Sequence, residues 1–176
     1  TDGSIVDIPR SAYVKAEEDV INELKGINKP FIVVINSKNP ESEEALKVKE
    51  EIETKYNVSA ILMSVENMKQ EDATNVLLTA LYEFPVNNVD IITPRWISVL
   101  EDENELKISF KNTISEALVE CKKVKDAKKM AEMIKENENV KSADITLIDT
   151  ATGDVTITLE AVDGLYEQVL NQILDT

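Results

Sequence analysis

An uninterrupted apolar run, residues 31–35, lies between Pro30 and a polar stretch that ends at Pro40. A run of this length without glycine predicts a buried strand that is covered on both faces. The polar residues Asn36–Asn39 then follow at the carboxyl end of this strand. Because ligands bind open α/β sheets just beyond the carboxyl ends of the strands, this loop is the first candidate for a binding site.

Helix and strand patterns alternate through the first half of the chain. Apolar residues repeat at helical spacing in three segments, and a second apolar run predicts another buried strand. The helices are predicted over about residues 10–24, 40–56 and 71–84, and the second strand over residues 60–65. Asn39 is predicted to cap the second helix, with Pro40 at its first position. Short connections between these elements predict a parallel α/β sheet, of which two strands are only a part.

The apolar faces of these helices predict which of their side chains are buried. All three faces are expected to pack against the strands. They carry Tyr13, Ala16, Val20, Leu24 and Ile27 in the first helix, Ala45, Val48, Ile52 and Tyr56 in the second, and Ala73, Val76, Leu77, Ala80, Leu81 and Phe84 in the third.

The pattern changes after Pro85, and residues 87–176 are predicted to form a separate, small α+β module after an α/β segment over residues 1–86. Two segments alternate between apolar and polar positions and predict a hairpin with one face in water. These segments are residues 143–147 and 155–159, with a turn near residues 152–154. A short strand is predicted over residues 88–93, helices near residues 95–100, 104–121 and 125–134, and a last helix from residue 163 with Leu165, Val169 and Ile173 inward.

The composition excludes several kinds of chemistry. The chain has 176 residues, a formal net charge of −15, no histidine and a single cysteine, Cys121. Without histidine there is no Ser-His-Asp or Cys-His catalysis, and one cysteine forms no internal disulfide. The negative charge repels nucleic acid and anionic membranes, and solubility alone is the other explanation for it. Cys121 lies on the apolar stripe of a predicted helix, which indicates a structural thiol rather than a nucleophile.

The loop after the first strand resembles the base-reading sequence N-K-x-D of P-loop GTPases. Asn36 matches its first position, but the other two specified positions differ, and Asn39 stands where an aspartate accepts hydrogen bonds from guanine. Because a carboxamide offers donors as well as an acceptor, selectivity for guanine is weakened and adenine fits as well. Ser64 ends the second strand, where the same fold completes the base pocket, and is a third candidate contact. A plain helix cap at Asn39 and a simple turn at Asn67 are the alternatives.

Phosphate binding has no candidate residues in this chain. The glycines are Gly3, Gly26, Gly153 and Gly164, and no sequence of the form G-x-x-x-x-G-K-[ST] occurs. Such a loop holds nucleotide phosphates through its backbone N–H groups. The chain alone is therefore expected not to hydrolyse a nucleotide, and we assign no catalytic residue and no metal ligand within it.

Short segments along the whole chain are similar, in order, to the stage IV sporulation protein A family. They are residues 1–5, 7–10, 13–14, 16–18, 23–25, 29–31, 34–37, 63–66, 81–86, 94–96 and 161–166. The sequence Leu-Tyr-Glu-Phe-Pro-Val at residues 81–86 is too specific for a chance match. The resemblance implies an internal piece of a longer protein, namely the C-terminal half of a P-loop NTPase sheet and an α+β middle domain. The P-loop, the magnesium-binding motif and the C-terminal domain are expected outside it.

The resemblance also implies a function. The family resembles the translation-factor class of P-loop GTPases but uses ATP, and hydrolysis drives polymerisation into the basement layer of the bacterial spore coat. The expected cofactors are ATP and magnesium in the longer protein, with neither bound to this chain alone. The expected partners are further copies and the spore coat and cortex morphogenetic proteins, with membrane contact only through an anchoring protein and no nucleic acid. The expected location is cytoplasmic, on the mother-cell side of the forespore outer membrane.

Two other interpretations stay open. The chain could belong to a non-enzymatic scaffold or interaction protein, which a failure of the complete protein to bind any nucleotide would favour. A relative of the GTPases predicts instead that GTP outcompetes ATP, and Asn39 argues against this.

Overall fold

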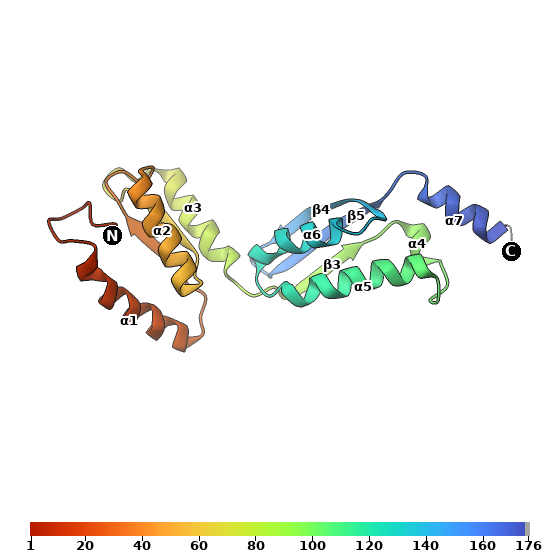
Figure 1. The fold of residues 1–176 in the computed structure, drawn as a ribbon, viewed down its shortest axis with the longest axis horizontal. Helices are drawn as coiled ribbons and strands as arrows, with labels where there is room; N and C mark the ends of the chain where they lie inside the picture. The colour runs from red at the N-terminus through yellow and green to blue at the C-terminus, as the bar shows by residue number, and fades with distance from the viewer. Residues whose placement is uncertain (175–176) are drawn as a thin grey trace. The chain divides into compact units, whose positions relative to one another are not determined.

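The computed structural model describes residues 1–174, without the side chains of residues 172 and 173. The chain divides into two compact units, Thr1–Glu83 and a second unit that begins at Phe84 (Figure 1). Each unit has its own cluster of buried apolar side chains. The two units are therefore described separately.

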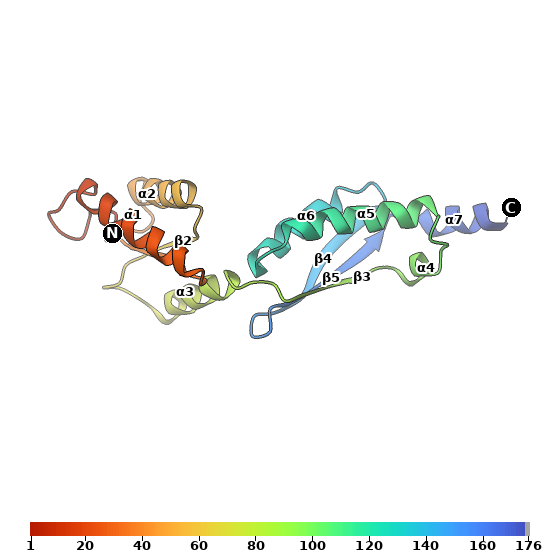
Figure 2. The ribbon, with the colours of Figure 1, turned by 90° about the horizontal axis from the view of Figure 1, so that it is seen from below.

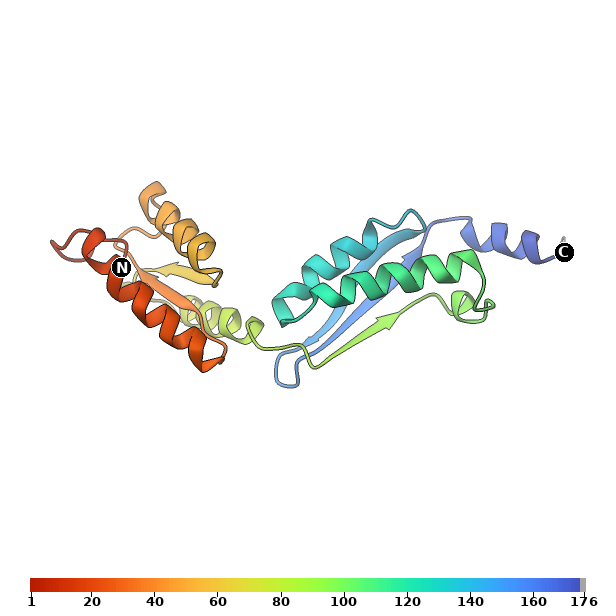
Figure 3. The same ribbon diagram turned by 60° about the horizontal axis from the view of Figure 1, so that its bottom comes forward.

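The first unit is a parallel pair of strands with three helices (Figure 3). Its elements are α1 (Ser11–Ile27), β1 (Val33–Asn36), α2 (Glu43–Tyr56), β2 (Ala60–Met63) and α3 (Gln70–Tyr82). Val33 lies opposite Ala60 and Asn36 opposite Met63, so both carboxyl ends lie at the same edge of the pair. The predicted α/β class of this segment is confirmed.

Helix α2 begins three residues later than predicted, because Ser42 rather than Asn39 caps it. The Ser42 Oγ accepts a hydrogen bond from the Ala45 N–H at 3.2 Å. This bond satisfies one of the free N–H groups in the first turn of the helix. The predicted cap is therefore wrong, and Asn39 is left in the loop between β1 and α2.

The core of the first unit lies between α1, α2 and the strands. The predicted face of α2 is confirmed at Ile52 and Tyr56, which are buried, but the predicted face of α1 is wrong at Ala16, Val20 and Ile27, which are exposed. Val20 and Ile27 are each 54% exposed, whereas Ile21 is buried. One residue corresponds to 100° of rotation about a helix, so α1 meets the strands with the neighbouring stripe. The buried cluster is Ile21, Ile35, Ile52, Tyr56 and Ala60.

Helix α3 and one face of β1 are more exposed than their sequences predict. No residue of α3 is buried, and Leu77 is 63% exposed. Val34 in the middle of β1 is 41% exposed, so this strand is not covered on both faces. This exposure follows from the width of the sheet, because two strands are too narrow to cover the apolar faces of three helices.

The second unit contains a three-stranded mixed sheet, which confirms the predicted α+β class. The central strand β5 is antiparallel to β4 and parallel to β3, in the order β3-β5-β4. The strands β4 and β5 form the predicted hairpin, whereas the pairing of β3 with β5 was not predicted. The elements are β3 (Asn88–Ile92), α4 (Arg95–Ser98), α5 (Glu105–Glu120), the 3₁₀ turn η1 (Val124–Asp126), α6 (Ala127–Lys135), β4 (Val140–Asp149), β5 (Asp154–Ala161) and α7 (Leu165–Leu174).

Helices α5 and α6 pack beside each other on one face of this sheet (Figure 2). Helix α5 begins after Asn104, whose Oδ1 accepts a hydrogen bond from the Leu106 N–H at 3.0 Å. Trp96 packs against the core between the layers, and its ring centroid lies 5.8 Å from that of Tyr166. Both layers contribute buried side chains to this core, among them Phe110, Ala117, Ala127, Met130, Ile134, Val155, Ile157 and Leu159.

The expected alternation of β4 is interrupted by a β-bulge. Ile145 lies opposite Ile157, but Leu147 lies opposite Thr156, so Thr146 is an extra residue without a partner position. An extra residue moves the following side chains to the other face of the sheet. Leu147 is consequently 55% exposed, although the alternation predicts that it points into the core.

The last helix, α7, is largely exposed. Val169 is buried as predicted, whereas Leu170 is 41% and Leu174 74% exposed. The side chain of Ile173, which was predicted to face inward, lies outside the described residues. No helix in the described part of the chain is long and apolar enough to cross a lipid bilayer.

Cys121, just after α5, is half-buried, and we expect it to react slowly. Burial raises the pKa of its thiol, and the negative charge of Asp126 raises this pKa further. Because the thiolate is the reactive form, alkylation by iodoacetamide at neutral pH should be several-fold slower than in the unfolded chain. Mass spectrometry with and without urea measures both rates. Equal rates would contradict the raised pKa.

Candidate functional site

Two loops leave the carboxyl edge of the β1–β2 pair together. Ser37 is the first residue after β1, and its N–H donates a hydrogen bond to the Met63 carbonyl at 3.0 Å. The loops after β1 and β2 therefore begin side by side, which confirms that both leave the same edge. This edge is where open α/β sheets bind their ligands.

Asn36 connects the two loops through its side chain. Its Oδ1 accepts a hydrogen bond from the Val65 N–H at 3.0 Å, and its carbonyl accepts one from the Asp2 N–H at 3.4 Å. Within residues 1–174, Nδ2 makes no hydrogen bond of its own. The oxygen thus braces the loop after β2, while the two amide N–H donors are available to an acceptor on a ligand.

Asp2 and Ser37 hold the start of the chain against this edge. Ser37 is 1% exposed, and its hydroxyl donates a hydrogen bond to the Asp2 carboxylate. The same carboxylate accepts from the Ser4 hydroxyl at 2.6 Å and from the Ser4 N–H at 2.9 Å. Burial raises the pKa of Asp2, but these hydrogen bonds outweigh it and hold the pKa below its usual value. Their stabilising effect is therefore present above the unfolded pKa and is lost as the pH falls through the folded one.

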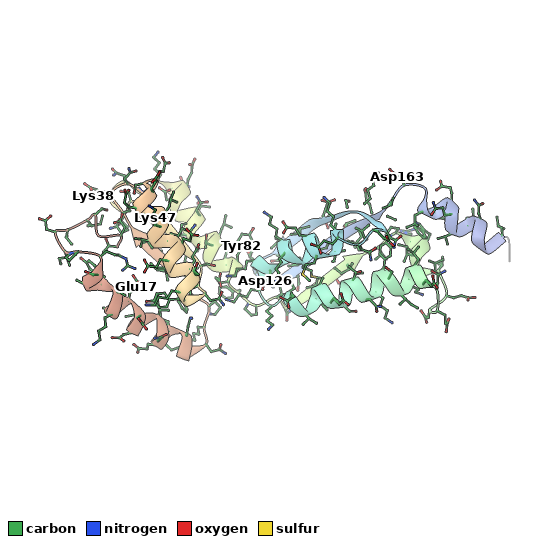
Figure 4. All side chains as sticks on the ribbon, viewed as in Figure 1. Glu17, Lys38, Lys47, Tyr82, Asp126 and Asp163 are labelled. Carbon is green, nitrogen blue, oxygen red and sulfur yellow. The ribbon has the colours of Figure 1, made fainter. Side chains whose placement is uncertain are left out.

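Lys38 and Asn39 form the exposed tip of the loop after β1. The Lys38 N–H donates to the Ser4 Oγ at 2.9 Å, and the Asn39 N–H donates to the Ser37 Oγ at 3.1 Å. The backbone of the tip is thereby fixed, while both side chains are exposed (Figure 4, in which Lys38 is labelled). A carboxamide such as that of Asn39 can pair with an adenine edge, where it accepts from the amino group and donates to a ring nitrogen.

Ser64 lies in a turn directly after β2. Its Oγ accepts a hydrogen bond from the Asn67 Nδ2 at 3.2 Å, and its carbonyl accepts from the Asn67 N–H at 3.2 Å. Asn67 is therefore a turn residue, as the simpler interpretation predicted. The Ser64 hydroxyl still has its own proton to donate.

Apart from the Lys38 ammonium and the Asp2 carboxylate, which Ser4 and Ser37 engage, the edge offers neutral hydrogen-bonding groups. Amide and hydroxyl groups on adjacent loops suit the recognition of a nucleobase edge better than acid–base chemistry. In the part of the chain that the structure describes, no three Asp, Glu or Cys side chains are grouped to hold a metal ion. The residues that gather here do not extend to the phosphates of a nucleotide, since the chain lacks a glycine-rich loop.

Reasoning from the sequence missed Asp2 and Ser37. Asp-Gly-Ser is a typical turn sequence in which the aspartate accepts from the backbone two residues on, and Ser4 confirms this. That signal predicts the turn but not the strand end against which it packs. The hydrogen bonds from Ser37 to Asp2, from Asp2 to Asn36 and from Lys38 to Ser4 show this contact.

The two halves of the chain match two domains of one protein family. Residues 1–85 match the family model of the stage IV sporulation protein A ATPase domain, and residues 86–176 match the model of the stage IV sporulation protein A middle domain. No solved structure matches the chain.

Proteins from three bacteria are similar to the chain along nearly its whole length. Stage IV sporulation protein A of Bacillus subtilis (strain 168) is 39% identical over 174 residues, which is 99% of this chain and 35% of that protein. The proteins of the same name from Bacillus anthracis and Clostridioides difficile (strain 630) are 36% and 34% identical over 174 and 172 residues, with 35% of each covered. The chain thus spans about a third of the length of the curated relatives it matches.

Proposed function

The chain belongs to the stage IV sporulation protein A family, and we propose that it supplies the nucleobase side of an ATP site together with an assembly module. The ATPase-domain match over residues 1–85 supports the first role, and the middle-domain match supports a separate second unit. The observation that carries the proposal is the meeting of two polar loops at the carboxyl edge of a parallel strand pair within the ATPase segment.

Each candidate residue has a distinct role in this proposal. Asn36 donates from its Nδ2 to a ring nitrogen of the base while its oxygen holds the neighbouring loop. Asn39 reads the amino group of adenine with its carbonyl oxygen, and Ser64 donates from its hydroxyl. ATP phosphates and magnesium bind parts of the longer protein outside this chain, because the chain has no glycine-rich phosphate loop.

The longer protein is, in this proposal, a cytoskeletal ATPase that acts in sporulation and polymerises into the basement layer of the spore coat. Its partners are further copies and the coat and cortex morphogenetic proteins, and an anchoring protein attaches it to the mother-cell side of the forespore outer membrane. The strongly negative charge supports a function without nucleic acid. The family match and the sporulation relatives support these roles.

Phosphate release from ATP and GTP by the complete native protein tests this function. Asn36→Asp keeps the oxygen that accepts from Val65 but removes both amide donors. Loss of one hydrogen bond to the base should raise KM for ATP about tenfold. Asn39→Asp creates the carboxylate that reads guanine, so the ratio of GTP to ATP turnover should rise about tenfold.

Asn22→Asp is the matched control, because Asn22 lies exposed on α1 and receives the same added charge. It should leave both kinetic constants unchanged. The 176-residue chain alone should release no phosphate. If the complete protein binds neither nucleotide, the scaffold interpretation replaces this one; if Asn36→Asp behaves like Asn22→Asp, Asn36 only braces the loop.

A further inference from the structure

One face of the sheet in the second unit is left open. The helices α5 and α6 cover the other face, which carries the buried side chains of β5 (Figure 2). On the open face two apolar side chains, Ile92 and Leu147, are 52% and 55% exposed. We call this surface the open sheet face, and its outward residues are Asp90, Ile92, Asp144, Thr146, Leu147, Asp149, Asp154, Thr156, Thr158 and Glu160.

The charges on the open sheet face are nearly all negative. Asp90 and Asp144 lie on the two edge strands, on either side of the threonines of β5, and both are exposed. Two further aspartates and Glu160 add three carboxylates. Lys141, at the start of β4, is paired with Asp163 at 2.8 Å. The open sheet face therefore attracts a cationic surface.

The opposite side of the same unit is rich in lysine. Helix α6 buries Ala127, Met130, Ala131 and Ile134 against the sheet, so its other side points to solvent. That side carries Lys128, Lys129 and Lys135 together with Glu132 and the capping residue Glu136, and all five are exposed. Lys129 is paired with Glu120 of α5 at 3.1 Å. We call this surface, made by Lys128, Lys129 and Lys135, the lysine face.

We propose that the open sheet face of one copy binds the lysine face of a second copy of this chain. This inference rests on the proposed function, in which the second unit makes subunit contacts, and it names the surfaces that do so. The open sheet face has threonines and two exposed apolar side chains, and carboxylates flank them. This distribution is that of an interface core surrounded by a polar rim.

A second copy is favoured over other occupants because the two faces differ in charge and lie on opposite sides of one unit. Each copy then presents one acidic and one basic surface. Because these surfaces lie on opposite sides of the unit, they cannot contact each other within one molecule. A contact between two different patches is heterologous, and it continues from copy to copy unless rotation closes a ring. The arrangement therefore predicts an open row of subunits rather than a two-fold dimer.

Charge reversal on each face tests the proposal in the full 176-residue chain by sedimentation velocity. The sheet variant is Asp90→Lys with Asp144→Lys, and the helix variant is Lys128→Glu with Lys135→Glu. Each variant alone should lose self-association at least tenfold, because the sheet variant loses most of its negative charge and the helix variant carries negative charge on both faces. An equimolar mixture should associate again, since the unchanged sheet of the helix variant is opposite in charge to the unchanged helix of the sheet variant.

Charge reversals in the first unit provide the controls. Glu23→Lys with Glu51→Lys, and Lys15→Glu with Lys47→Glu, change the net charge by the same amounts at exposed positions. Both should associate like the unchanged chain. Salt should weaken the association at least tenfold between about 50 mM and about 500 mM NaCl, as charges become screened over a few ångströms. Circular dichroism verifies that every variant is folded.

Three results would overturn the proposal: a monomeric chain at low salt, equal association of face and control variants, or a mixture that stays dissociated. A second measurement distinguishes failure of this proposal from failure of the proposed function. It is phosphate release from ATP by the complete protein, with and without the same substitutions. If the complete protein turns over ATP and neither pair of face substitutions changes self-association, the proposed ATPase function is supported and this interface is wrong. If the complete protein turns over no ATP but self-association depends on the charges of both faces, this interface is supported and the proposed ATPase function is wrong.

Discussion

Replacement of Ile157 with alanine is expected to lower the free energy of unfolding of the second unit by about 4 kcal/mol. Ile157 is 0% exposed and lies in the central strand β5. Ile91 of β3 and Ile145 of β4 lie directly opposite it, so three isoleucines form one row on the core face. Truncation leaves a cavity in the middle of this row, which the paired strands cannot close without losing ladder hydrogen bonds.

Urea unfolding followed by tryptophan fluorescence measures this loss. Trp96 is the single tryptophan of the chain and packs against the same core. Thr156→Ala is the matched control, because Thr156 precedes Ile157 on β5 but points to the open sheet face. Its effect should stay within about 1 kcal/mol. Equal losses for the two variants would mean that the core face of β5 has been assigned wrongly.

Replacement of Gly153 with valine is expected to lower the free energy of unfolding by about 3 kcal/mol. Gly153 lies in the turn between β4 and β5 with a φ of 79°, a conformation that L side chains rarely adopt. A Cβ atom there would lie 2.8 Å from the Pro85 carbonyl oxygen and 3.2 Å from the Asn87 nitrogen. The Asn87 N–H donates to the Gly153 carbonyl at 2.8 Å, so the turn cannot move away without breaking this bond.

Gly164→Val separates the backbone strain from the close contact. Gly164 has a φ of 82°, but no described atom beyond its chain neighbours lies within 4 Å of its Cβ position. Gly164→Val should lower the free energy of unfolding by the backbone strain alone, roughly 1–2 kcal/mol, whereas Gly153→Val should lower it by more. Urea unfolding monitored by Trp96 compares the two. Equal losses would contradict the contact between the turn and Pro85.

The helices of the second unit follow from the sequence because their spacing is a local property. Ala127, Met130, Ala131 and Ile134 recur at helical spacing and all four are buried in α6. A helix turns by a constant angle per residue, so apolar positions identify its buried side without knowledge of its neighbours. The pattern in α1 failed because Val20 and Ile21 lie 100° apart on the helix, and only packing against the strands and α2 decides which of them is buried.

The candidate site was predicted only as far as its position in the chain. The sequence places Asn36 and Ser64 after two strands, and parallel pairing then brings these strand ends together. The choice between Asn39 and Ser42 as the cap was not decided by residue type, since both side chains cap helices. The loop backbone decided it, because the Ser37 hydroxyl fixes the Asn39 N–H before the helix begins.

The sequence by itself determined the order of elements, the separate character of the two halves and the absence of a phosphate loop. These three features depend on hydrophobic periodicity and on residue types at short spacing, both of which are local properties of the chain. The tertiary structure alone decided the position of β3 beside β5 and the contact of Asp2 with Ser37. It also decided the bulge at Thr146, which turns Leu147 outward. Each of these depends on segments far apart in the chain, whose contacts form only when the whole unit packs.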